Sequence, residues 1–113
     1  MANAAREQVE QAGYPEPDEA VEGRPQLVFF YSRTSGLCRR VDGYLGQILQ
    51  RHRNHRTFKL IRVPIEDHAP LVELFGIDVV PTLVVVHERK VCARIDAPSG
   101  RPEIERTLAP WLR

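Results

Sequence analysis

The residues best suited to chemistry are Ser35 and Cys38, which stand three positions apart in the segment Ser-Gly-Leu-Cys. Apolar residues recur at helical spacing after this segment, so Cys38 should lie in the first turn of a helix. There, unpaired backbone amides and the helix dipole favour a negative charge on the sulfur. Three arginines nearby in the sequence, Arg33, Arg39 and Arg40, add positive charge. This pattern makes Cys38 the candidate catalytic thiol of the chain.

Both residues also have a purely structural interpretation, and the sequence leaves the choice open. Cys38 falls beside Val41 and Leu45 on the inward side of the helix, where a buried cysteine behaves as a small apolar residue. Ser35 precedes the helix, where serine commonly accepts a hydrogen bond from an amide in the first turn, here that of Cys38. Such an N-cap contributes about 1 kcal/mol to stability and requires no catalysis.

The second cysteine and the histidines are weaker candidates. Cys92 is expected in an edge strand, roughly 10 Å or more from the strand that leads into Cys38, whereas a disulfide requires Cα atoms within about 7 Å. We therefore expect no internal disulfide.

His52 and His55 have a spacing that lets two helical side chains share a metal ion, but the flanking arginines repel a cation. We expect neither a metal site nor a cofactor.

Size and charge limit the class of protein. The 113 residues fit one domain. Sixteen basic and fifteen acidic side chains leave a net charge of +1, so no overall field draws the chain to nucleic acid or to an anionic membrane. No apolar run approaches the roughly 18 residues of a membrane span, and the N-terminus lacks the apolar core of a secretory signal. We expect a cytoplasmic monomer whose thiols are reduced.

The predicted elements follow from apolar spacing and from turn residues. Residues 1–24, which are rich in proline, glycine and acidic side chains, are expected to be a flexible tail, and residues 25–113 the folded domain. The predicted elements are a strand at 27–31, a helix from Leu37 that the basic segment 51–56 ends, a strand at 58–65, a helix at 68–75, strands at 82–86 and 90–95 joined by a turn through 87–89, and a helix starting near Pro102. The order βαβαββα predicts an α/β fold, a four-stranded mixed sheet flanked by helices.

Residues 26–112 resemble the thioredoxin superfamily in three segments. The first apolar strand runs into Ser-Gly-Leu-Cys, as the Cys-x-x-Cys site of thioredoxins follows a strand. Residues 63–67, Val-Pro-Ile-Glu-Asp, match a strand that ends in an acidic turn. Residues 79–82, Val-Val-Pro-Thr, match the segment in which thioredoxins hold a cis-proline beside the active site. The resemblance implies the thioredoxin-like fold.

The chemistry departs from that of the family at several positions. Thioredoxins attack a substrate disulfide with the first of two thiols, and here that position is Ser35. A serine hydroxyl cannot form a mixed disulfide, because exchange requires a thiolate. The buried acidic residue of the family falls on Phe29, and the lysine that accompanies it falls on Arg62. The resemblance therefore implies a thioredoxin-like protein with an atypical Ser-x-x-Cys, in which ordinary dithiol reduction is excluded.

Two functions of different classes remain open. In the first, Cys38 is a monothiol redox centre linked to cell redox homeostasis, with a protein or a thiol as its partner. Peroxiredoxins, which are built on the same fold, use a similar Thr-x-x-Cys arrangement, and the related glutathione transferases use a hydroxyl to stabilise a bound thiolate. In the second, the domain is a non-catalytic binding or chaperone-like module. Its groove is shaped by cis-Pro81 and pairs with an extended peptide beside Val80, Gly36 and Leu37.

Overall fold

The computed structural model describes residues 23–112. The elements are β1 (Gln26–Tyr31), α2 (Gly36–Gln50), the 3-10 helix η2 (Arg51–Arg56), β2 (Lys59–Pro64), α3 (Ala69–Leu74), β3 (Thr82–His87), β4 (Lys90–Asp96) and α4 (Arg101–Leu108). Each predicted strand and helix is present, and apart from the end of α2 the bounds differ by at most one residue. The predicted flexible tail lies outside the described residues, except for Gly23 and Arg24.

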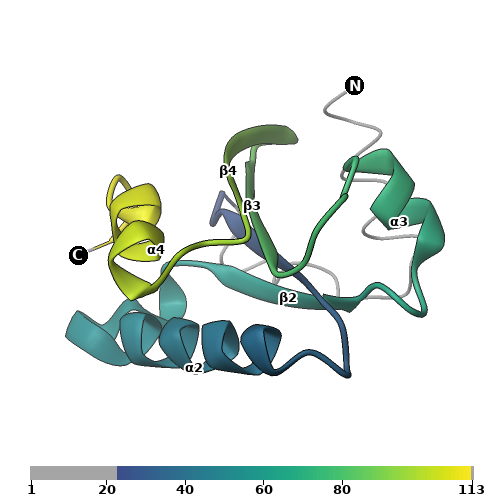
Figure 1. Cartoon of the computed structure of the whole chain (residues 1–113). Coiled ribbons are helices and arrows are strands. Elements are labelled where there is room, and N and C mark those ends of the chain that lie inside the picture. The colour runs from purple at the N-terminus through teal and green to yellow at the C-terminus, as the bar shows by residue number, and fades with distance from the viewer. Residues whose placement is uncertain (1–22, 113) are drawn as a thin grey trace.

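The strands form one sheet in the order β2-β1-β3-β4 (Figure 1). β1 and β2 are parallel, and α2 provides the crossover that parallel neighbours require. β3 lies antiparallel to both β1 and β4, so the sheet is mixed. The predicted α/β architecture with a four-stranded mixed sheet is confirmed.

Successive residues of β1 face opposite sides of the sheet and enter two separate apolar cores. Leu27 and Phe29 pack with residues of α2 and α4 on one side. Val28 and Phe30 pack with residues of α3 on the other. The helices accordingly lie on both sides of the sheet (Figure 1). Burial on both faces explains why β1 is a continuous apolar run without alternation.

The sequence predicted that the basic segment 51–56 ends α2. This prediction is wrong, because the segment does not form the last turn of α2. The helix ends at Gln50, no basic residue lies in its last turn, and Arg51–Arg56 form a separate 3-10 helix. Asn54, which is buried, explains the change. Its side-chain amide donates to the Arg51 carbonyl at 2.7 Å and its oxygen accepts from the Thr57 hydroxyl at 2.9 Å. These local bonds compete with continuation of the α-helix.

The hairpin between β3 and β4 turns at Glu88 and Arg89, which both have positive φ angles, 53° and 67°. His87 was expected in the turn, but it is the last residue of β3, and its ring nitrogen makes a hydrogen bond with the Gly23 carbonyl. β4 is an edge strand, as predicted, and a bulge opposite Val85 and Val86 sets Cys92 out of register. Within residues 23–112, no helix is long and apolar enough to cross a membrane.

Candidate functional site

Ser35 caps the N-terminus of α2. Its backbone is extended, with φ −94° and ψ 119°, and its hydroxyl oxygen accepts a hydrogen bond from the Cys38 amide at 3.1 Å. This is the contact predicted from the sequence, and it satisfies one of the amides that a helix start leaves unpaired. No acidic residue occupies the first turn. Ser35 therefore has a structural role whether or not it has a chemical one.

Cys38 points inward from the first turn of α2. Its side chain is 2% exposed and packs in the same core as Val41 and Leu45. The Ser32 amide donates a weak hydrogen bond to its sulfur, with a nitrogen–sulfur distance of 3.5 Å. Among the described residues, the Ser32 amide is the one hydrogen-bond partner of the sulfur. Cys38 is a free thiol, and so is the exposed Cys92 of the edge strand.

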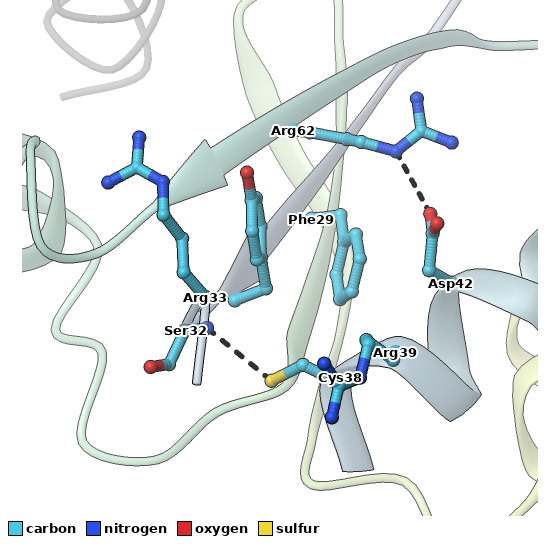
Figure 2. A pocket seen from close by; sticks show the side chains of 8 residues that line it. Phe29, Ser32, Arg33, Cys38, Arg39, Asp42 and Arg62 are labelled. Carbon is cyan, nitrogen blue, oxygen red and sulfur yellow. Dashed lines mark hydrogen bonds and ion pairs between the residues drawn. The ribbon is translucent and has the colours of Figure 1, made fainter. Parts of the chain in front are cut away.

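A pocket of about 160 Å³ opens beside Cys38 (Figure 2). It is lined by Phe29, Tyr31, Ser32, Arg33, Cys38, Arg39, Asp42 and Arg62. β1, the loop after it and the first turns of α2 supply seven of these residues, and β2, which is more distant in sequence, supplies Arg62. Cys38 is one of the lining residues, although its side chain is nearly buried.

Two of the positions at which the sequence departs from the thioredoxin pattern lie side by side at the pocket. Phe29 and Arg62 are paired in the parallel register of β1 and β2. The Phe29 ring is 1% exposed and stacks on Tyr31, with ring centroids 5.4 Å apart. The Arg62 Nε donates to a carboxylate oxygen of Asp42 at 2.9 Å (Figure 2). Sequence reasoning missed Asp42, although its position four residues after Cys38 places both on one side of α2.

Two acidic residues of the turn after β2 hold the loop that precedes α2. Glu66 accepts hydrogen bonds from the Ser32 hydroxyl and, at 3.4 Å, from the Arg33 amide, and Asp67 forms an ion pair with the Arg33 side chain. The Ser32 hydroxyl is the main cause that lowers the pKa of Glu66, and the Arg33 guanidinium lowers the pKa of Asp67. The carboxylate of Asp67 in turn raises the pKa of Arg33. These contacts fix Ser32, whose amide faces the sulfur.

The peptide bond between Val80 and Pro81 is cis, as the sequence predicted. The Thr82 hydroxyl donates to the Val79 carbonyl at 2.7 Å, and the Ala97 amide donates to the Pro81 carbonyl at 2.8 Å. Pro81 is buried and Val80 half-buried, whereas Val79 is 45% exposed. Val80 packs against both apolar cores, the one that contains Cys38 and the one on the other side of the sheet.

The other predicted candidates do not converge on this pocket. Arg33 and Arg39 line it, but Arg40 does not. His55 is exposed on η2, and within the part of the chain that the structure describes no three histidine, cysteine or acidic side chains are grouped closely enough to hold a metal ion. The His52 side chain lies outside the described part. The exposed Leu37, 44% accessible, points away from the core.

A family model described as thioredoxin matches residues 9–110. The chain belongs to the thioredoxin family. Among solved structures similar to this thioredoxin-family protein are a Fasciola hepatica thioredoxin, with 16% identity and a TM-score of 0.69, and the germline-specific thioredoxin Deadhead of Drosophila melanogaster, with 15% identity and a TM-score of 0.72. The first similarity covers 81% of this chain and 85% of the other, and the second covers 83% and 87%.

Mitochondrial thioredoxin 3 of Saccharomyces cerevisiae is similar at 13% identity, with a TM-score of 0.66 and coverage of 80% of this chain and 83% of the other. At these identities the structural likeness establishes the thioredoxin fold alone. No curated protein sequence matches the chain. What this thioredoxin-family member does must therefore be argued from its own residues.

Proposed function

We propose that this chain is a monothiol redox protein of the thioredoxin family in which Cys38 carries the chemistry. The observation that supports the proposal is the placement of the Cys38 sulfur. The sulfur lies at the capped start of α2 and faces the Ser32 amide, and Cys38 is among the residues that line an open pocket of about 160 Å³. A cysteine that served only as core packing would need no adjoining pocket and no loop fixed around its sulfur.

The same placement argues against dithiol exchange. Ser35 occupies the position from which the first thiol of a thioredoxin attacks, and its hydroxyl is engaged with the Cys38 amide at 3.1 Å. Because Cys38 is only 2% exposed, a protein disulfide cannot approach its sulfur as it would an exposed thiol. The second cysteine, Cys92, lies on β4 at the far edge of the sheet from β2. We therefore expect no turnover in a standard insulin-reduction assay, and robust turnover would contradict the assignment of Ser35.

The reaction that fits a buried thiol beside a small pocket is oxidation by a hydroperoxide. The Cys38 thiolate attacks the terminal peroxide oxygen, the oxygen–oxygen bond breaks, and the leaving alkoxide takes up a proton to become an alcohol. The sulfur is oxidised to a sulfenic acid and the peroxide is reduced. A low-molecular-weight thiol then displaces water from the sulfenic acid to form a mixed disulfide, and a second thiol molecule releases Cys38 as a thiol.

The test is trapping of the sulfenic acid in a Cys92→Ala protein. The folded protein is treated with hydrogen peroxide and then with dimedone, and the adduct is located by peptide mass spectrometry. We expect a dimedone adduct on Cys38 that forms under native conditions and is absent from a Cys38→Ser control. A Cys38 that is modified only after the protein is unfolded would overturn the proposal, because the thiol would then be packing alone.

A second candidate function is peptide binding at the groove beside cis-Pro81. The specific observation in its favour is the exposure of two large apolar side chains, Leu37 at 44% and Val79 at 45%, in the two segments that the family resemblance places around this groove. Exposed apolar groups around a groove are typical of protein-binding sites. Leu37→Ser and Val79→Ser should each weaken binding to peptides selected from a random library, whereas Cys38→Ser should not. Loss of binding in Cys38→Ser would instead assign the interaction to the thiol.

A further inference from the structure

The pocket beside Cys38 is lined by three arginine residues, Arg33, Arg39 and Arg62, and by one acidic residue, Asp42. Its remaining polar residue is Ser32, and its walls include the Phe29 and Tyr31 rings, which stack on each other. A small cavity with an excess of positive charge and an aromatic wall suits a ligand that is anionic at one end and apolar at the other.

The three arginines differ in how fully they are engaged. Arg33 forms an ion pair with Asp67, outside the pocket lining. Arg62 uses its Nε for Asp42, so its terminal amino groups remain for another acceptor (Figure 2). The Arg39 side chain makes no hydrogen bond or ion pair with any residue between 23 and 112, and it lies back toward Gly36, where a Cβ would come within 3.9 Å of its terminal nitrogen. Two arginines can therefore donate to a ligand.

We infer that this pocket binds a small carboxylate, held by Arg39 and Arg62 with its apolar end against the aromatic wall and beside the Cys38 sulfur. The inference rests on the proposed function, because it names the class of small reactant that reaches this thiol. A volume of about 160 Å³ is similar to that of protein cavities, on the order of 150 Å³, that bind benzene, so an ion of the size of acetate fits. Among small hydroperoxides and electrophiles, those that carry a carboxylate react preferentially with Cys38.

The first test compares two alkylating reagents of the same size and mechanism, the anion iodoacetate and the neutral iodoacetamide. In each case the thiolate attacks the methylene carbon, a sulfur–carbon bond forms and iodide leaves with the electrons of the carbon–iodine bond. The ratio of the two second-order rate constants at Cys38 is measured in a Cys92→Ala protein. Any effect of a variant on the fraction of thiolate cancels in this ratio, which reports only the preference of the pocket for the anion.

We expect the iodoacetate-to-iodoacetamide ratio at Cys38 to be at least about fivefold higher than for a neutral model thiol, N-acetylcysteinamide. Removal of one nearby charge by Arg39→Gln should lower the ratio roughly three- to tenfold. Arg40→Gln, which changes the next and equally exposed arginine of α2 but not the pocket, should leave it within about twofold. Asp42→Asn should raise the ratio, because it removes the opposing carboxylate and releases Arg62. A ratio that Arg39→Gln and Arg40→Gln change equally would overturn the inference.

If neither reagent modifies Cys38 in the folded protein, the proposed thiol function is refuted. A second measurement then tests carboxylate binding by itself. Sodium acetate is titrated into the ¹⁵N-labelled protein at constant ionic strength, maintained with sodium chloride. We expect saturable shifts of the Ser32 and Cys38 amide resonances in the wild type and in Arg40→Gln, and their loss in Arg39→Gln. Shifts that are linear in acetate and unaffected by Arg39→Gln would show that the pocket does not bind a carboxylate.

Discussion

Replacement of Ser35 by alanine separates the structural from the chemical role of this position. The hydroxyl accepts from the Cys38 amide at 3.1 Å, and alanine leaves that amide without an acceptor at the start of a 15-residue helix. Loss of an N-cap costs about 1 kcal/mol. For a domain of this size, we expect the melting temperature of Ser35→Ala to fall by roughly 4–8 °C. The midpoint of urea unfolding should fall by about 0.5 M, with an unchanged slope.

Circular dichroism followed against urea and temperature provides the measurement, and two further variants provide the controls. Ser35→Asp retains a capping oxygen and adds a negative charge to a first turn that has none, so it should be at least as stable as the wild type. Thr34→Ala removes the neighbouring exposed hydroxyl, which does not cap the helix, and should change stability by less than about 0.5 kcal/mol. The reasoning fails if Ser35→Ala is as stable as the wild type, or if Ser35→Asp is destabilised as much as Ser35→Ala.

Three further changes test other parts of the structure. Ala97, exposed and with a φ of 48°, adopts a conformation that favours glycine, so Ala97→Gly should raise the free energy of unfolding by roughly 0.5–1 kcal/mol in urea titrations. The lowered pKa of Glu66 means that its contribution to stability is complete above the unfolded-state pKa of about 4.3 and is lost as the pH falls through the folded-state value. Wild type should therefore lose more stability than Glu66→Gln between pH 5 and pH 3, measured by urea unfolding at each pH; equal losses would show that the contact with Ser32 contributes nothing. Phe29→Ala should cost about 3–5 kcal/mol in the same assay, because the ring is 1% exposed and stacks on Tyr31; a cost below about 1 kcal/mol would mean that the ring is not a packed wall of the pocket.

The parts of the fold that were predictable are those set by local chemistry. The run Leu27–Tyr31 was predicted to be a strand covered on both faces, because five large apolar residues in succession put apolar side chains on both faces of the sheet. The N-cap could be predicted because serine directly precedes an apolar helical repeat. The cis bond before Pro81 was inferred from the family resemblance and from a proline placed between β-branched residues and a strand.

What the sequence could not reveal depends on contacts between distant segments. Glu66 bonds Ser32 across 34 positions, and Arg62 reaches Asp42 across 20. Neither pair can be recognised without the sheet register that brings β2 beside β1. The end of α2 was mispredicted for a related reason. Six residues rich in arginine suggested a helix C-terminus by charge, but the buried Asn54 decided the local backbone through its own hydrogen bonds.

The first turn of α2 separates the two proposed functions, peptide binding and thiol chemistry, onto different side chains. Leu37 and Cys38 are consecutive, so their side chains point about 100° apart around the helix. Leu37 is 44% exposed, whereas Cys38 is 2% exposed and lines the pocket. A peptide that covers Leu37 does not thereby reach the sulfur, and a small molecule in the pocket does not contact Leu37. Because serine replaces the first cysteine, Cys38 carries the one thiol at the start of this helix. Substitution of Leu37 therefore tests peptide binding at the proposed groove, and substitution of Arg39 tests the reactivity of the thiol.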